Sequence, residues 1–449
     1  MTAAPRRQLG LGITAAIVVA NMIGTGIFIS TGFQAASIHD PLTILVAWVV
    51  GGVIALCGAS CYAELGSMMP EAGGEYVYLR EAYHPVAGFV SGWVSLTAGF
   101  SAPIAAAALT FAGYFATLLP AFAGAATQKI VAIALIVAIT GLHSFDTKVG
   151  GWVQAAFTAT KVLLITVFIV AGLCSGNGDW SHFHFQHGGL SNIGTSAFAI
   201  ALMYVSFAYS GWNAAAYIAS DVKKPARTLP RSLLLGTGIV MALYVLLNVV
   251  YFYAVPSDGL AGVLAVGDKA ARTLFGDGAG RLITSLIALA LVSAVSAMVM
   301  AGPRVYAAMA EDRALPPQLA WHSARGVPSV AVIAQGVIAI GFVLAMNPAQ
   351  LIEFVGFTLA ISAAFTVAAV FVMRLRGARA AYRTFGYPVT PIVFIAASAW
   401  IAYAQIRVHP LASLIVGMVL AVGAALYVVL RPASPPPAKP VLPEARVVE

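Results

Sequence analysis

Two hydrophobic stretches of this chain are interrupted near their centres by residues that a membrane helix normally avoids. The first is Ala20-Asn21-Met22-Ile23-Gly24-Thr25-Gly26-Ile27-Phe28, and the second is Phe207-Ala208-Tyr209-Ser210-Gly211-Trp212-Asn213. Gly costs about 1 kcal/mol relative to Ala inside a helix, and in lipid each released N–H or C=O group needs a partner. Each stretch opens one half of the chain, and such paired interruptions are typical of a transporter's substrate site.

The composition around these stretches is that of a membrane protein. The chain has 449 residues, of which 60% are hydrophobic and only 9% are charged, against about 25% charged residues in a soluble domain. Hydrophobic segments of spanning length predict an all-α polytopic membrane protein with about twelve transmembrane helices. Their approximate limits are 11–38, 41–66, 86–119, 127–145, 148–173, 194–219, 231–255, 281–310, 328–347, 350–374, 387–407 and 410–431.

The positive charges predict the orientation in the membrane. If both termini are cytoplasmic, about 18 of the 24 Lys and Arg residues face the cytoplasm and 5 face outward, with Lys161 inside a helix. This asymmetry follows the positive-inside rule. The net charge of +8 therefore reports topology in a cell membrane, with the lipid bilayer as partner, and does not indicate nucleic acid binding.

The order of the spans predicts an inverted repeat. Residues 11–173 and 194–374 each form a group of five spans that begins with an interrupted helix, and an odd number of spans makes the two groups antiparallel. Residues 1–10 are predicted to be a cytoplasmic N-terminus and 174–193 an extracellular loop. Two further spans occupy 387–431, and the proline-rich residues 432–449 are predicted to form a disordered cytoplasmic tail.

The first interruption has groups for both ends of an amino acid. N–H groups at Gly24, Thr25 and Gly26 would open the outer half-helix, whose N-terminus suits a carboxylate. Carbonyls released at Met22 and Ile23 suit an ammonium. The alternative reading of Gly-Thr-Gly is close packing of two membrane helices.

The second interruption combines a flexible glycine with an amide and aromatic rings. Phe207, Tyr209 and Trp212 are candidates to close over a substrate, and Asn213 is a candidate to bind a polar group or an unwound carbonyl. An interfacial aromatic belt is the alternative, but belts lie at the ends of spans rather than near the centre.

Lys161 lies near the middle of the fifth span, too far from either end for its side chain to reach water. An ionisable group there is expected to face the bundle interior with a partner. The sequence places no acidic residue at this depth, so released carbonyls of the first interruption, Ser293 or Ser296 are the candidate partners. Two roles stay open: a proton carrier, or a fixed charge that replaces a bound cation.

Other segments carry weaker signals. Pro70–Tyr78 predicts a tight turn into a short helix in the loop after the second span, as part of an inner gate. The three cysteines show no metal or disulfide pattern. His182, His184 and His187 could bind a metal, but a solvated loop explains them better. We expect no metal, no cofactor and no enzyme activity.

Several of these segments together resemble the amino acid–polyamine–organocation superfamily. Gly24–Phe28 resembles its G-S-G-I-F signature, and Pro70–Tyr78 resembles P-x-x-G-G-x-Y. Phe207–Asn213 and Asp221–Arg231 resemble the paired motifs F-x-Y-x-G-W-N and E-x-K-N-P-x-R-x-x-P-R. With the lysine of span five, they resemble the L-type amino acid transporter branch and its bacterial relatives.

The resemblance implies a LeuT-type fold with discontinuous helices 1 and 6 that bind an amino acid between them. It implies that Thr25 and Gly26 hold the carboxylate, and that backbone near Ile23, Phe207 and Ser210 holds the ammonium. The small residues Ala208 and Ser210 of the substrate site allow either a small substrate or room for a larger one. In addition, Phe207 would be the gate and Asn213 would support the unwound segment. Lys161 would occupy the place where sodium-coupled relatives bind a cation, which disfavours sodium coupling.

The chain departs from the family pattern at three positions. Thr25 replaces a serine and Asp221 replaces a glutamate. The loop at about 120–127 has no cysteine, whereas animal members use one there to join a heavy chain, so we expect no disulfide-linked partner.

The resulting prediction is a sodium-independent amino acid permease or exchanger that works by alternating access. Neutral L-amino acids are favoured because the sequence shows no acid near the site; cationic amino acids or polyamines are the alternative. Proton coupling stays open. A major-facilitator transporter is a more distant alternative, since it would carry G-x-x-x-D-R where this chain has Pro70–Tyr78. An intramembrane enzyme or a channel would need clustered catalytic residues or a continuous polar stripe.

Overall fold

The computed structural model describes residues 9–71, 73–145, 148–184, 189–323 and 326–430. Within these ranges the regular secondary structure is helical, apart from one isolated bridge between Leu9 and Val222. The α-helices are α1 (Leu11–Met22), α2 (Gly26–Ile38), α3 (Pro41–Met68), α4 (Glu75–Ala82), α5 (Pro85–Val94), α6 (Ala102–Leu118), α7 (Ala125–Phe145), α8 (Lys148–Cys174), α9 (Ser196–Tyr209), α10 (Ala214–Tyr217), α11 (Pro225–Ala254), α12 (Ser257–Leu260), α13 (Val266–Glu311), α14 (Ser329–Ala345), α15 (Pro348–Leu375), α16 (Val389–Val408) and α17 (Pro410–Leu430). A π-helical segment, η1 (Ser95–Ser101), joins α5 to α6, and short 3₁₀ turns are η2 (Pro120–Phe122), η3 (Trp180–His182), η4 (Gly189–Asn192), η5 (Ala219–Asp221) and η6 (Pro317–Ala320).

The helices have the length and apolarity of a polytopic membrane protein. Among the described residues, eight helices are long and apolar enough to cross a bilayer, and the bent pair α1 and α2 makes a ninth. Three shorter apolar helices, Thr158–Cys174, Ser196–Tyr209 and Ser329–Ala345, accompany them. The predicted all-α membrane class is confirmed.

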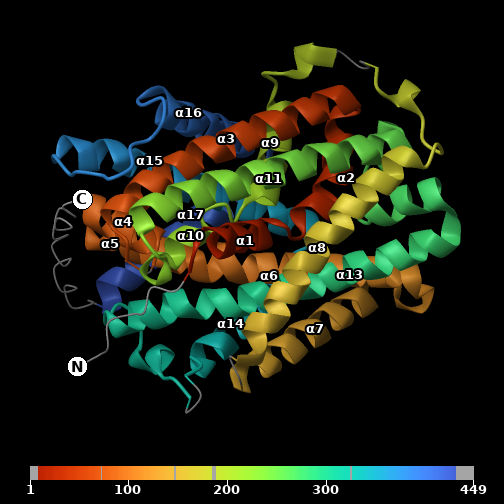
Figure 1. Cartoon of the computed structure of the whole chain (residues 1–449). Coiled ribbons are helices and arrows are strands. Elements are labelled where there is room, and N and C mark those ends of the chain that lie inside the picture. Colours follow the sequence, from red (N-terminus) through yellow and green to blue (C-terminus); the bar gives the residue numbers. More distant parts are fainter. Residues whose placement is uncertain (1–8, 72, 146–147, 185–188, 324–325, 431–449) are drawn as a thin grey trace.

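The long helices run side by side along one direction of the bundle (Figure 1). We call its two ends the α4 end and the α12 end. At the α4 end, α4 packs on α5 and α15, and the Tyr76 hydroxyl donates to the carboxylate of Asp312 after α13. At the α12 end, α12 packs on α2, and Asp258 pairs with His39. Helix α1 packs on α11, and α2 packs on α9, so the two interrupted segments lie inside the bundle.

Local capping explains where several helices begin. The Asp40 carboxylate accepts a hydrogen bond from the Thr43 N–H at 2.8 Å, and Pro41 occupies the first turn of α3. Thr195 caps α9 through its hydroxyl, and Asn347 forms a capping box at the start of α15. Such caps stabilise a helix start by about 1 kcal/mol each.

Three segments differ from the sequence prediction or fall outside the structure. Helix α13 begins at Val266, well before the predicted limit of 281, and kinks at Gly276. The π-helical turns of η1, inside the third span, were not predicted. The predicted disordered tail 432–449 and residues 1–8 of the predicted N-terminal segment lie outside the described residues.

Candidate functional site

The first interruption is a real helix break. Helix α1 ends at Met22, α2 begins at Gly26, and the two axes differ by 40°. Ile23 has extended backbone with ψ 91°, which ends the ladder of α1. In the described part of the chain, the N–H groups of Thr25, Gly26 and Ile27 donate to no acceptor. These groups point from the N-terminus of α2, where a helix carries about half a positive charge.

The carbonyls released at this break are bound by protein side chains. The Tyr244 hydroxyl of α11 donates to the Met22 carbonyl at 2.6 Å. The Lys161 Nζ of α8 donates to the Ile23 carbonyl at 3.2 Å. Sequence reasoning named a released carbonyl as a partner of Lys161, and the structure places the lysine there. It missed Tyr244, whose only signal was a tyrosine inside an apolar helix.

The second interruption is also a helix break. Helix α9 ends at Tyr209, Ser210 is extended with ψ 149°, and Gly211 has a φ of +96°. A residue with a side chain rarely adopts that φ, so Gly211 permits the turn. The chain then re-enters a helix at Ala214, with Asn213 at its cap position.

The two breaks face and touch one another. A Cβ atom at Gly26 would lie 2.3 Å from Ala208 Cα, and a Cβ atom at Gly211 would lie 2.7 Å from the Asn21 carbonyl oxygen. Only glycine permits either approach. The packing interpretation of Gly-Thr-Gly is thus confirmed at Gly26, and the N–H groups beside it have no acceptor among the described residues.

Lys161 is 1% exposed, as its position in span five predicted. No ion pair of its ammonium occurs within the described ranges. Ser293 is buried, and its hydroxyl has no hydrogen-bond partner there. Ser296 lies 2.7 Å from His143 Nε2 through its hydroxyl, so in this conformation its partner is the histidine.

The three aromatic residues of the second break pack on neighbouring helices, Phe207 on α15 and both Tyr209 and Trp212 on α3. Phe207 is 5% exposed and lies beside Gly356 of α15. The Tyr209 hydroxyl donates to the Trp48 carbonyl at 3.1 Å, so this ring is held by α3. Trp212 packs edge-on against Tyr62 with ring centroids 4.6 Å apart.

One expectation of the sequence analysis is wrong: an acidic residue does reach the candidate site. Glu75 was placed in a loop after span two, but its Oε1 accepts a hydrogen bond from Asn213 Nδ2 at 2.9 Å. Tyr62 donates to the same oxygen at 2.6 Å, and Ser362 donates to Oε2 at 3.0 Å. Burial raises the pKa of the Glu75 carboxyl, and the hydrogen bonds from Tyr62, Ser362 and Asn213 oppose that shift.

The reason for this error is the position of α4. The predicted tight turn is present, with positive φ at Gly73 and Gly74, but it folds α4 back under the second break instead of leaving it in solvent. The sequence did contain a signal that Glu75 is buried, because the apolar residues Tyr76-Val77-Tyr78-Leu79 follow it. A carboxylate next to buried apolar residues needs hydrogen-bond partners inside the protein.

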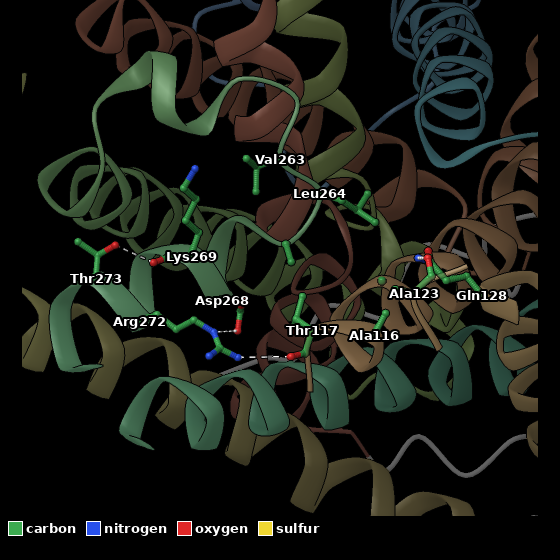
Figure 2. A pocket seen from close by; sticks show the side chains of 12 residues that line it. Ala116, Thr117, Ala123, Gln128, Val263, Leu264, Asp268, Lys269, Arg272 and Thr273 are labelled. Atoms are coloured by element: carbon green, nitrogen blue, oxygen red, sulfur yellow. Dashed lines mark hydrogen bonds and ion pairs between the residues drawn. The ribbon is translucent and has the colours of Figure 1, made fainter. Parts of the chain in front are cut away.

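A cavity of about 540 Å³ lies away from the breaks, at the α12 end (Figure 2). Its polar lining includes Asp268, whose carboxylate accepts hydrogen bonds from Arg272 Nε at 2.9 Å and Thr284 Oγ1 at 2.6 Å. Lys269 Nζ donates to the Gly259 carbonyl. None of the predicted site residues lines this cavity, and its charges are already paired, so we assign the site to the breaks.

The loop histidines do not gather into a metal site in the described part of the molecule. His182 Nδ1 lies 2.8 Å from the Phe252 carbonyl, and His184 contacts the Ser181 carbonyl. His187 lies outside the described residues. No group of three or more His, Cys, Asp or Glu residues with metal-binding geometry occurs in the ranges searched.

Two broken helices that meet inside an apolar helical bundle define a membrane transporter, and the comparisons with known proteins agree. The amino acid permease family matches residues 9–430. The chain is 32% identical to the serine/threonine exchanger SteT of Bacillus subtilis over 88% of this chain and 90% of that protein. It is 30% identical to human b(0,+)-type amino acid transporter 1, covering 83% of this chain and 77% of the relative. For human large neutral amino acids transporter small subunit 2, identity is 29%, covering 82% and 70%.

The chain therefore belongs to the amino acid permease family. It is an amino acid transporter of the multi-pass membrane class and not an enzyme. The resemblance inferred from the motifs is confirmed.

Proposed function

We propose that the two breaks form one site for an amino acid zwitterion. The N–H groups of Thr25, Gly26 and Ile27 would bind the carboxylate. Backbone carbonyls near Ile23, Phe207, Ala208 and Ser210 would bind the ammonium. The observation that supports this best is the set of α2 N–H groups without a protein acceptor, held directly against the second break.

The transport cycle that we propose uses the LeuT-type arrangement. The eight long spans, the broken pair and the three shorter apolar helices would make twelve spans, of which the first ten form two antiparallel groups of five. Both termini would be cytoplasmic, so the α4 end would be the inner side. Phe207 would close over the bound amino acid, with Tyr209 and Trp212 fixing the segment to α3.

We further propose sodium-independent exchange of small neutral amino acids. Lys161 would supply the fixed positive charge at the first break, where its ammonium already donates to the Ile23 carbonyl, and Ser293 would face it. The name of the Bacillus relative supports serine and threonine as first substrates to test. The absence of cysteine at 120–127 supports function without a disulfide-linked heavy chain.

Cationic amino acids are the second candidate. The plus sign in the name of the b(0,+)-type relatives is the observation that favours them. The Glu75 carboxylate does not favour them, because three donors already occupy it.

Uptake into proteoliposomes tests the proposal. A panel of labelled amino acids is added with and without internal amino acid, with and without sodium, and with and without a pH gradient. We expect uptake of neutral amino acids that depends on internal amino acid and is the same with and without sodium. If no amino acid is taken up under any condition, the proposed function is wrong. Strict dependence of uptake on sodium would overturn the proposed role of Lys161. Uptake driven by a pH gradient alone would show proton symport instead of exchange.

A further inference from the structure

Glu75 is the point where three helices meet beneath the second break. Its carboxylate accepts hydrogen bonds from Tyr62 on α3, Ser362 on α15 and Asn213 between α9 and α10. The residue is 5% exposed. Among the described residues no cation pairs with it, and Arg80, on the same helix, binds Glu81 and Asp312 instead.

The turn before α4 holds Glu75 against the break. The Gly73 N–H donates to the Tyr217 carbonyl at 3.3 Å. A Cβ atom at Gly74 would lie 2.8 Å from the Tyr217 ring, so the turn and α10 are in direct contact. Glu75 is therefore fixed by backbone contacts and not only by its own side chain.

An ionised carboxylate can only accept hydrogen bonds. Asn213 must therefore turn its Nδ2 group toward Glu75, and this choice leaves its Oδ1 on the other side of the amide. Oδ1 accepts no hydrogen bond from the described residues. Within the described residues, the second break thus has a side-chain acceptor available.

We infer that Glu75 is a positioning residue of the substrate site: it orients the Asn213 amide so that Oδ1 is presented as an acceptor to the substrate ammonium. The inference rests on the proposed zwitterion site. It adds a residue outside the two breaks, and it makes substrate affinity depend on whether Glu75 is ionised.

Protonation of Glu75 would release the Asn213 amide from this fixed orientation. A protonated carboxyl carries an O–H donor and can bind Asn213 through either amide atom, so Oδ1 is no longer held free. Since burial raises the pKa of Glu75, this change falls at a higher pH than for an exposed glutamate.

The side chains that form hydrogen bonds with the Glu75 carboxylate, those of Tyr62, Asn213 and Ser362, carry no charge between about pH 5 and pH 8. The titratable groups that face it are the phenols of Tyr62, Tyr78 and Tyr217. On the surrounding elements, α15 contributes the Ser362 hydroxyl, and its Arg374 pairs with Glu64 of α3. Further titratable groups on these elements are Tyr76, Arg80, Glu81, His84, Tyr306 and Asp312, of which His84 is exposed.

The test compares Glu75→Gln with Glu81→Gln in proteoliposomes, measuring KM and Vmax of serine exchange from pH 5 to pH 8. Glutamine has nearly the same shape as glutamate, but its amide can either donate or accept. We expect KM to rise about tenfold in Glu75→Gln with Vmax within about twofold, a factor equivalent to about 1.4 kcal/mol. Glu81→Gln, on the same helix and paired with Arg80, keeps both constants.

The pH profile and a double variant separate positioning from a merely structural role. Wild-type KM rises as the pH falls, whereas KM of Glu75→Gln is flat and close to the acid wild-type value. Adding Asn213→Ala to Glu75→Gln raises KM no further than Asn213→Ala alone. Glu75→Asp, which keeps the charge on a shorter chain, restores part of the affinity and serves if Glu75→Gln does not fold.

Wild-type KM and pH profile in folded Glu75→Gln would overturn the inference, as would strictly multiplicative effects in the double variant. Failure of the proposed function is a different result, because the wild-type protein would then exchange no amino acid at all.

Discussion

The two breaks of this transporter are stabilised in opposite ways. At the first, side chains from α8 and α11 bind the released carbonyls, and the N–H groups of α2 are left without partners. At the second, aromatic packing and the Asn213–Glu75 hydrogen bond fix the segment. In the proposed site the first break would bind the carboxylate, and the contacts that hold the second break would separate as the bundle opens. Four substitutions test this difference.

The largest effect is expected where the two breaks touch. In Gly26→Ala the new methyl group would lie 2.3 Å from Ala208 Cα, so the breaks must separate. Overpacking of this kind typically costs about 1–3 kcal/mol, and here it displaces the α2 N–H groups, so we expect exchange to fall at least ~100-fold. The measurement is labelled serine exchange normalised to folded protein.

Gly24→Ala is the matched control from the same motif. Its methyl group would meet nothing closer than 3.9 Å, which is an ordinary contact. Equal losses in the two variants would mean that helix flexibility, and not contact between the breaks, makes these glycines necessary.

The next largest effect is expected at Lys161. Lys161→Met leaves the Ile23 carbonyl without its donor, and an unsatisfied buried group costs about 1–3 kcal/mol, or roughly 5- to 150-fold. We expect exchange to fall by that order. Lys129→Met is the control, because Lys129 also donates to a backbone carbonyl, that of Leu344, but at an exposed position.

The same variant distinguishes the two roles of this lysine. If Lys161 carries a proton, residual transport in Lys161→Met loses its pH dependence apart from the part due to Glu75. If Lys161 is a fixed charge, the wild-type pH profile persists at a lower rate. Full exchange activity in Lys161→Met would exclude both roles.

A smaller effect is expected at the gate. Phe207→Leu removes the aromatic ring that is proposed to close over the substrate but keeps most of the apolar volume, so we expect transport to slow about tenfold while serine binding, followed by thermal shift, is retained. Phe198→Leu on the same helix, where the ring stacks on Trp400, should transport normally. Normal transport in Phe207→Leu would contradict the gate assignment.

The smallest effect is expected at Tyr244. Tyr244→Phe removes the 2.6 Å hydrogen bond to the Met22 carbonyl, and a single neutral hydrogen bond contributes about 0.5–1.5 kcal/mol, or roughly 2- to 10-fold in affinity. Tyr251→Phe is the control on the same buried face of α11, since that hydroxyl has no partner among the described residues. A greater loss in Tyr251→Phe would argue against a special role for Tyr244.

The sequence was sufficient for the features that depend on local chemistry. Both breaks were predictable because glycine and polar groups are disfavoured at the centre of an apolar membrane helix. The turn into α4 followed from Gly73 and Gly74. The membrane class followed from hydropathy. Each of these signals lies in the sequence within a few residues of the feature that it predicts.

Features that depend on contacts between distant segments were missed. Glu75 is a loop residue by sequence distance, and only the folding of α4 under the break brings it to Asn213. Tyr244 reads as one more aromatic residue of an apolar helix until α1 lies against α11. The early start of α13 at Val266 was hidden because its first turns are rich in glycine and charge.

Competition by substrate analogues tests the zwitterion site most directly. Exchange of labelled L-serine by the wild-type protein in proteoliposomes is measured with excess unlabelled L-serine, with the corresponding amine that lacks the carboxylate, and with the corresponding acid that lacks the ammonium. Because the proposed site binds both charged ends of the amino acid, we predict that L-serine competes and that both truncated analogues fail to compete at about a hundredfold higher concentration. Competition by either analogue as strong as that of L-serine would contradict the account.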